Sequence, residues 1–374
     1  MNNTENRIEK MNGFANRSLM ERQLPIVDQN LKTLLNTRDI IHKRSESDIV
    51  FSKPLISKDD LGIIYPNTIT VIQGKKGVHK SRLTEAFATI FLDLNRLVEH
   101  LGFSRTLTKP AMVLYVDTER NQKDQLPYAM QKIRIKAGFP KNQNPEHFDF
   151  ISLVDIPRAE RFDTLKSYIE LVQIKFKEYQ LIVILDVITD CIENFNDPKE
   201  SLKLIDLINE QANQKDVTFL CVIHENPSSS EKARGHLGTE IINKASQVIQ
   251  IGFDSDSKEL ILLKFLHSRN TKSIDPLYLK YDEDSKGLVE ANPNEIKLNH
   301  LSKQEKAPLN QVEAWFKRHL IGEMSKKDAY ERLMNHFDCK DKTIDDRINS
   351  LIENDFLEKS KNQNSVYFKF KINF

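Results

Sequence analysis

The chain has 374 residues, of which 39% are hydrophobic, so it can bury a sizeable core and wholesale disorder is excluded. Lys and Arg number 55 and Asp and Glu 54, a formal net charge of +1, so any contact with nucleic acid must come from local patches. Three scattered cysteines argue against a zinc site or a disulfide framework, and short apolar runs with a polar N-terminus predict a cytoplasmic protein without membrane contact.

The first 60 residues mix apolar and charged positions and predict an arm with one or two exposed helices. From residue 68, short apolar runs alternate with helical patterns; one helix is expected from Leu83 to Leu97 and others near 122–137, 161–179 and 198–214. Alternation of this kind is typical of a parallel sheet covered on both faces, so the predicted fold class is α/β. The expected strands are TITVIQ (68–73), MVLYVD (112–117), FDFISL (148–153), LIVILD (181–186), TFLCVI (218–223), QVIQIG (247–252), ELILLKF (259–265) and PLYLKY (276–281).

A polar segment with two prolines separates this large domain from a smaller one. The smaller region predicts helices near 309–320, 325–337 and 341–354, followed by a hairpin with its turn at 360–364. We therefore expect an arm at 1–60, an α/β domain at 61–285, a linker at 286–308 and a compact module at 309–374.

A phosphate-binding loop is predicted between the strand at 68–73 and the helix that follows it. Backbone N–H groups at the helix N-terminus would face phosphates, Lys80 would reach the terminal phosphates, and the Ser81 hydroxyl would bind Mg²⁺. His79 stands where the motif GxxxxGK[ST] has glycine; its β-carbon could narrow the loop, or its imidazole could add a donor. The residues expected at the ATP phosphates are Gly74, Lys75, Lys76, Gly77, Val78, His79, Lys80, Ser81 and Arg82.

Two carboxylates are placed to support hydrolysis, which needs a magnesium-ordering group and a base that activates water. Asp186 ends the most apolar strand, so we assign it to Mg²⁺. Glu119 follows a neighbouring strand and can face the γ-phosphate, because ligands bind at the carboxyl edge of parallel sheets. Glu119 is the predicted general base, and Asp117, two residues earlier, is the alternative.

This order of motifs resembles the RecA-like ATPases, and most closely the hexameric replicative helicases of the plasmid RepA and DnaB type and their mobile-element relatives. In that superfamily the catalytic glutamate follows the strand after the P-loop helix, which is the place of Glu119. In AAA+ proteins it directly follows the Walker B aspartate, where this chain has Val187. The resemblance covers about residues 60–285 and implies ATP and Mg²⁺ as cofactors, DNA as a partner and assembly into a hexameric ring. It also implies other replication or transposition proteins as further partners.

The resemblance also implies roles for two later segments. His224 matches the sensor position, and the loop after it would face DNA, although an ordinary solvated loop has the same composition. In KFLHSRNT (264–271), Arg269 matches the arginine that reaches the neighbouring subunit's γ-phosphate, or it is a surface residue after an edge strand; the preceding lysine position holds His267. The basic residues expected at DNA in the loop segment are Lys232, Arg234, His236 and Lys244.

The C-terminal module resembles a winged helix, in which one helix and a wing contact DNA. The polar face of the helix at 341–354 carries Lys342 and Arg347, and the hairpin carries Lys361. Many acidic residues nearby leave protein docking as the alternative to DNA contact. For the whole chain, the first expectation is an ATP-driven helicase-like motor on DNA that serves replication, mobilisation or transposition. The second is a nucleotide-gated DNA-binding or assembly factor with little hydrolysis.

Overall fold

The computed structural model describes residues 29–93, 100–106, 109–227, 231–255, 259–292, 306–362 and 365–371. The chain divides into two units, residues 1–52 and 53–374. Of the first unit the structure describes helix α2 (Gln29–Ser45), in which no residue is buried, as expected for an exposed helix of the arm. The remainder of the expected arm before residue 29 lies outside the described residues.

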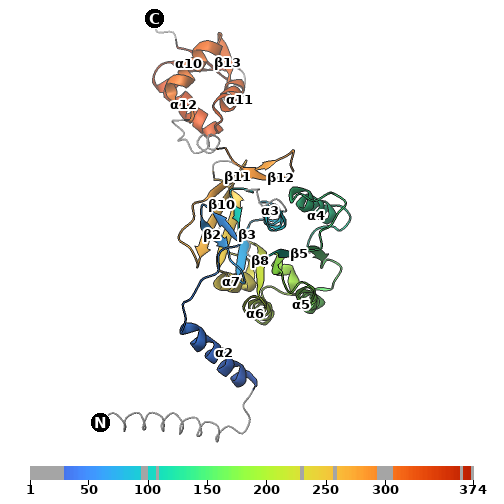
Figure 1. The fold of residues 1–374 in the computed structure, drawn as a ribbon. Coiled ribbons are helices and arrows are strands. Elements are labelled where there is room, and N and C mark those ends of the chain that lie inside the picture. The colour runs from blue at the N-terminus through green and yellow to red at the C-terminus, as the bar shows by residue number, and fades with distance from the viewer. Residues whose placement is uncertain are drawn as a thin grey trace, which may run out of the picture. The chain divides into compact units, whose positions relative to one another are not determined.

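A nine-stranded sheet forms the centre of the second unit (Figure 1). Its strand order is β12-β11-β10-β9-β3-β8-β7-β5-β6. The six strands from β9 to β6 run parallel, and β10, β11 and β12 extend the sheet in antiparallel fashion. The strands are β3 (Ile69–Gly74), β5 (Ala111–Asp117), β6 (Phe148–Ser152), β7 (Gln180–Asp186), β8 (Val217–His224), β9 (Gln247–Phe253), β10 (Leu260–Ser268), β11 (Leu277–Asp282) and β12 (Gly287–Glu290).

Helices cover both faces of this sheet, and the predicted α/β class is confirmed (Figure 1). One face carries α3 and α4, and the other carries α5, α6, α7 and the short 3-10 helix η1. The expected continuation of α3 to Leu97 lies outside the described residues. The helices are α3 (Lys80–Leu92), α4 (Gln125–Lys136), α5 (Arg158–Lys175), η1 (Ile188–Cys191), α6 (Pro198–Gln214) and α7 (Gly235–Lys244).

Each central strand contributes to both halves of the core because successive side chains point to opposite faces. In β5, Val113 and Tyr115 pack beneath α3 and α4, whereas Leu114 and Val116 pack beneath α5 and α6. This double burial explains why the strands read in the sequence as continuous apolar runs rather than as alternating patterns.

The boundaries of the large domain differ from those expected. A small antiparallel sheet of β1 (Ile56–Lys58), β2 (Leu61–Ile64) and β4 (Ser104–Arg105) begins inside the region assigned to the arm. At the other end, β12 pairs with β11 inside the region assigned to the linker. β1 has three residues and β12 has four, and strands this short show too little periodicity to be recognised in the sequence.

The C-terminal module has its own core and the order helix–strand–helix–helix–strand–strand. The three expected helices are confirmed, and a third strand, which the sequence did not reveal, pairs with the hairpin in the order β13-β15-β14. The elements are α10 (Leu309–His319), β13 (Glu323–Ser325), α11 (Lys326–Phe337), α12 (Asp341–Glu353), β14 (Leu357–Asn362) and β15 (Ser365–Phe370).

Candidate nucleotide-binding site

A cleft of about 740 Å³ opens at the carboxyl edge of the parallel strands. It lies where β3, β7 and β8 end, because parallel strands bring their carboxyl ends to the same edge. The volume is in the range of small-molecule sites. The cleft brings together the predicted loop residues from Lys75 to Ser81 with Glu119, Asp186, His224 and Arg234.

The loop between β3 and α3 owes its shape to two glycines. A Cβ on Gly74 would lie 2.3 Å from the carbonyl oxygen of Ile251, so only glycine lets the loop leave β3 beside β9. Gly77 adopts a φ of +83°, a conformation that glycine reaches without steric cost. Lys80 Nζ donates to the carbonyl oxygens of Gly74 and Lys75, at 3.0 and 2.7 Å, which folds the side chain back over the loop. The ammonium therefore lies at the loop, where phosphate oxygens would take the place of these two carbonyl oxygens as its hydrogen-bond acceptors.

His79 occupies the position where the motif has glycine, and its φ of 66° explains why glycine suits that place. For a residue with a β-carbon, the left-handed conformation costs roughly 1–2 kcal/mol. The imidazole stacks on Tyr281 with ring centroids 5.1 Å apart and 12° between the ring planes, and it lies edge-on to Phe253. Burial, with a contribution from Arg82, lowers the pKa of His79, so the ring is neutral at pH 7. The side chain is thus a packing residue of the loop, and its stacking offsets the strained backbone.

Ser81 and Asp186 meet beside the loop. A hydrogen bond joins the Ser81 side chain to Asp186 and helps to lower the pKa of that carboxyl, although burial and nearby Asp117 raise the pKa above its ordinary value. Tyr115 also donates to Asp186 Oδ2, at 2.8 Å. A hydroxyl and a carboxylate in this position fit Mg²⁺, which takes few protein ligands and completes its shell with phosphate oxygens and water.

Glu119 faces the cleft from the end of β5, and His224 lies opposite it at the end of β8. His224 Nε2 is 3.5 Å from Glu119 Oε1. This hydrogen bond from His224 is the main cause that lowers the pKa of Glu119; burial opposes it, and the charges of Lys80 and Lys76 add to the lowering. Glu119 is therefore ionised at neutral pH and half exposed to the cleft, as a general base must be.

Asp117, the alternative base, is held by other contacts. Its Oδ1 accepts the backbone N–H groups of Glu119 and Arg120, at 3.2 and 2.7 Å, and its Oδ2 accepts Arg120 Nε at 2.5 Å. Its side chain is 1% exposed and does not line the cleft. The geometry favours Glu119 over Asp117 as the group that can reach a water molecule.

Arg120 is the centre of a buried charge network that the sequence did not reveal. Its guanidinium pairs with Asp117, with Glu85 at 2.9 Å and with Asp186 at 3.4 Å, and it lies over the ring of Tyr115. Although burial opposes it, the surrounding negative groups raise the pKa of Arg120, so the charge is permanent. Arg120 thus helps to fix the position of Asp186 on the side of the carboxylate away from the cleft opening. The sequence offered one signal for Arg120. It directly follows VLYVDTE, where the chain must turn at the end of a strand and a basic side chain can fold back onto the strand's carboxylates.

Glu225 is a second site residue that the sequence did not reveal. It lines the cleft one position after His224, is 6% exposed, and accepts hydrogen bonds from Gln73 and Gln250, at 2.9 and 2.6 Å. Glu225 also supports the charged form of Lys80. Polar residues inside two otherwise apolar strands, Gln73 and Gln250, were the available signal.

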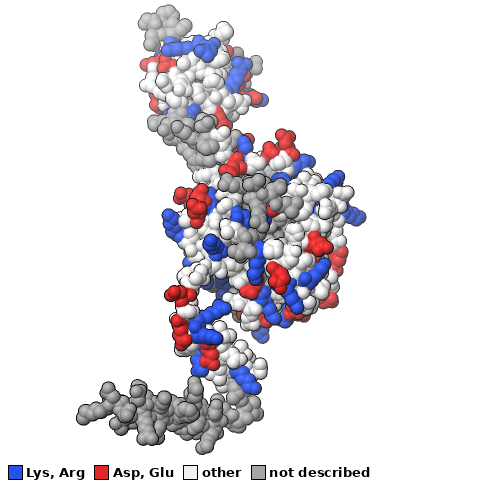
Figure 2. Space-filling view, in the orientation of Figure 1, with Lys and Arg blue, Asp and Glu red and all other residues white. Residues whose placement is uncertain are grey.

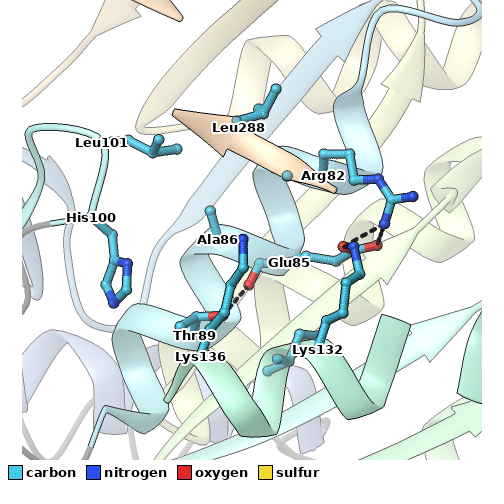
Figure 3. A pocket seen from close by; sticks show the side chains of 11 residues that line it. Arg82, Glu85, Ala86, Thr89, His100, Leu101, Lys132, Lys136 and Leu288 are labelled. Atoms are coloured by element: carbon cyan, nitrogen blue, oxygen red, sulfur yellow. Dashed lines mark hydrogen bonds and ion pairs between the residues drawn. The ribbon is translucent and has the colours of Figure 1, made fainter. Parts of the chain in front are cut away.

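Arg82, which the sequence grouped with the loop, does not line this cleft. It pairs with Glu85 at 2.9 Å, one turn further along α3, and borders a separate pocket (Figure 3). Successive residues of a helix point in directions about 100° apart, so the side chains of Ser81 and Arg82 lie on different faces of α3.

The basic residues expected at DNA in the segment after β8 do not form one patch. Lys232 and Arg234 lie at the carboxyl edge, where a bridge between Glu225 and Ala233 closes the loop and Arg234 stacks over Phe195. His236 lies in the first turn of α7, near Glu240. Lys244 ends α7, eight residues and about 12 Å further along the helix. Figure 2 shows basic and acidic side chains interspersed over the visible face.

Arg269 lies at the opposite edge of the sheet from the cleft. Its backbone N–H donates to Ser246, which in turn donates to Ile69 at the start of β3, and its guanidinium donates to the carbonyl of Asn243. β3 ends at Gly74, five residues later and about 17 Å away at 3.3 Å per residue. Arg269 is exposed and cannot reach the cleft of its own chain.

In the C-terminal module, the three predicted DNA contacts differ in their surroundings. Lys342 and Lys361 are exposed, whereas Arg347 donates to the carbonyl oxygen of Ala307 at 2.9 Å. Helix α12 carries four acidic residues and two basic ones, so its charge does not suit insertion among DNA phosphates. Of the expected wing, Asn364 and the side chain of Asn362 lie outside the described residues.

Comparison with known proteins finds solved structures that are similar to part of this chain, and two of them are described here. The RadB recombinase shares 14% identity with a TM-score of 0.42, covering 61% of this chain and 92% of that one. The flagellar accessory protein FlaH from Methanocaldococcus jannaschii shares 15% identity with a TM-score of 0.44, covering 62% of this chain and 92% of that one. No protein-family model matches the chain, and none of the curated proteins does. Likenesses this distant transfer no activity.

Two features are absent from the described residues. No helix there combines the length and apolarity that crossing a bilayer requires. No cluster of three or more histidine, cysteine, aspartate or glutamate side chains suited to a metal occurs in the same ranges.

Proposed function

We propose that the chain is a RecA-like, Mg²⁺-dependent ATPase that acts on DNA as an oligomer. The observation that carries the proposal is the convergence of Lys80, Ser81, Asp186 and Glu119 on one cleft at the carboxyl edge of the sheet. These residues come from three separate strand ends, yet each lies where a part of triphosphate hydrolysis needs it.

Each side chain has a distinct task in the reaction. The backbone N–H groups at the start of α3 and the Lys80 ammonium bind the phosphates. Ser81 and Asp186 would hold Mg²⁺, which neutralises charge on the phosphates when it is bound. Glu119 accepts the proton of the attacking water, and His224 keeps Glu119 ionised and oriented. Arg120 fixes Asp186 and leaves Glu119 free by holding Asp117.

The position of Arg269 supports a site shared between subunits. An exposed arginine at the amino edge of the sheet can serve only a neighbour's nucleotide, as in the hexameric ring that the sequence resemblance implies. Lys80→Ala and Arg269→Ala protomers should each be inactive alone and should recover part of the ATPase activity when mixed. Verified mixed oligomers without any recovery would refute the shared site.

DNA is the proposed partner of the motor. Arg234 lines the cleft, and Lys232 lies two residues before it in the chain, so a DNA strand bound there would respond to nucleotide. The C-terminal module has the element order of a winged helix and would provide a second contact, with DNA through Lys342 and Lys361 or with a replication or transposition protein through its acidic helix. A helicase-like role in replication, mobilisation or transposition of a mobile element follows from the sequence resemblance.

The decisive experiment is a steady-state ATPase assay with and without single-stranded DNA. Wild-type protein should hydrolyse ATP in a Mg²⁺-dependent manner and should be stimulated by DNA. Lys80→Ala should lose nucleotide binding, and Glu119→Gln should retain it while turnover falls. Nucleotide binding by Lys80→Ala equal to that of the wild type would refute the proposed site.

A nucleotide-gated DNA-binding factor with little hydrolysis is the second candidate, and the strained His79 is the observation that favours it. Under that function the wild type and Glu119→Gln would bind ATP equally and turn it over equally slowly, while DNA binding would still depend on ATP.

A further inference from the structure

A second pocket lies between α3, α4 and the start of β12 (Figure 3), and it shares no lining residue with the nucleotide cleft. Its volume is about 50 Å³. A water-sized group needs roughly 10–15 Å³ on this scale, so the pocket holds about four such groups. That is the number of oxygens in one phosphate, and it is too little for a nucleoside.

Positive charge exceeds negative charge around this pocket. Arg82, Lys132 and Lys136 line it, and Glu85 is the single carboxylate among the lining residues. Glu85 is already shared, because Arg82, Lys132 and Arg120 all donate to it, at 2.9, 3.0 and 2.9 Å. Burial lowers the pKa of Lys132; the charge and hydrogen bond of Glu85 oppose this, and the charges of Arg82 and Lys136 make smaller contributions that lower it.

Two polar groups at the pocket form no hydrogen bond or ion pair with the described residues, although the charge of Lys136 contributes to lowering the pKa values of Asp282 and His100. Lys136 forms no ion pair with any carboxylate of the described ranges, and His100 Nε2 is buried without a hydrogen bond from or to them. Lys136 is held close to Gly287: a Cβ built on that glycine would lie 2.4 Å from Lys136 Nζ. The absence of a side chain at Gly287 therefore lets the ammonium reach the pocket.

We propose that this pocket is a binding site for a phosphate group, separate from the nucleotide cleft. Arg82, Lys132 and Lys136 approach the cavity from α3 and α4, and His100 borders it from another segment (Figure 3). A tetrahedral dianion can accept hydrogen bonds from several directions at once and carries more charge than a planar carboxylate, so it suits donors that approach from different sides. Bound phosphate would supply the negative charge that Glu85 alone cannot.

Titration with inorganic phosphate tests the site in the full chain, by calorimetry in Lys80→Ala protein at constant ionic strength. Lys80→Ala is used so that the P-loop does not contribute binding. Saturable binding is expected with one phosphate per chain. Adding Lys136→Gln should weaken it at least about tenfold, the loss typical of one hydrogen bond to a charged group. Lys199→Gln, at an exposed lysine of α6, is the matched control and should leave the affinity unchanged.

Gly287→Ala provides a second variant that removes no charge. Its new β-carbon would displace the Lys136 ammonium, so phosphate affinity should fall severalfold while the thermal unfolding temperature stays near that of the parent. Phenyl phosphate in place of phosphate distinguishes the source of the ligand: equal affinity means that the pocket accepts the tip of a larger phosphomonoester, and loss of binding means that it accepts the free ion. Absence of phosphate binding, or binding that Lys136→Gln and Lys199→Gln affect equally, would overturn the proposal.

Discussion

Replacing Arg120 with methionine should destabilise the α/β domain strongly, because it removes the one cation shared by three buried carboxylates. Asp117, Asp186 and Glu85 have side chains 1%, 4% and 8% exposed, and each lies within 3.4 Å of the guanidinium. Methionine keeps much of the apolar stem, so the change isolates the lost charge. Breaking a buried ion pair by removing one partner costs about 3–5 kcal/mol.

The lower end of this range is the better expectation, because Glu85 keeps Arg82 and Lys132 as partners. A loss of about 3 kcal/mol is still a large part of the roughly 5–15 kcal/mol that stabilises a typical domain. Arg158→Met is the control: its pair with Asp190 spans 3.1 Å, but Arg158 is 45% exposed, and such pairs contribute less than about 1 kcal/mol. Urea unfolding followed by circular dichroism measures both variants.

The same substitution should change how stability depends on pH. Burial raises the pKa of Asp186, and Arg120 is the main influence that lowers it. Without Arg120 the native pKa rises further above the unfolded value, so the folded protein holds that proton more tightly than the unfolded chain. Stability then falls as pH rises through the native pKa, and the deficit of Arg120→Met should be smallest in mild acid and largest at neutral and alkaline pH.

A double variant tests whether stranded charge is the cause. Arg120→Met with Asp117→Asn removes the cation together with one of the carboxylates that it neutralises, so it should recover part of the lost stability. Two results would contradict this explanation: Arg120→Met unfolding at the same urea concentration as the wild type, or a double variant that is less stable than the single variant at every pH. In either case the network does not stabilise the domain in this way.

Four further results are expected. Glu119→Gln should bind ATP normally while turnover falls about 10²–10⁴-fold, measured by single-turnover hydrolysis; an unchanged rate would assign the base elsewhere. His224→Ala should move the acid limb of the pH–rate profile to higher pH, because the contact that lowers the pKa of Glu119 is gone; an unmoved limb would mean that His224 does not tune this carboxylate. His79→Gly should bind a fluorescent ATP analogue at least as tightly as the wild type, since the imidazole stacks on Tyr281, and a tenfold loss would show a phosphate contact instead. Deleting residues 306–374 should leave ATP binding intact; DNA binding with an unchanged salt slope would then favour protein docking for this module.

The sequence predicted the large sheet well because its strands are buried on both faces. Runs such as LIVILD need no partner in the sequence to be recognised as parallel strands, and their carboxyl ends locate the cleft. The short strands were missed for the opposite reason. β1, β12 and β13 have three or four residues each, and their identity depends on pairing with distant segments.

The parts of the site that lie in one motif were foreseen, whereas those created by packing were not. Lys80, Ser81 and Asp186 have positions fixed by the loop and the strand end. Arg120 and Glu85 become neighbours only because α3 packs over β5, thirty-five residues apart in the chain. Arg82 illustrates the same limit: it adjoins Ser81 in sequence but belongs to a different face of the helix and to a different pocket.

The two edges of the sheet connect the separate proposals. At the carboxyl edge, one chain provides the phosphate loop and the two carboxylates that we propose hold Mg²⁺ and act as the base, and the lysine or arginine that lines the cleft outside the loop is Arg234. At the amino edge, the same chain exposes Arg269 with no carboxylate partner within the described ranges. Under the proposed function, Arg269 would stabilise transition-state charge on the γ-phosphate of a neighbouring chain, because it lies too far from the cleft of its own chain. Two chains arranged head to tail bring the edges together, and repetition of that contact closes a ring when the rotation between subunits allows it.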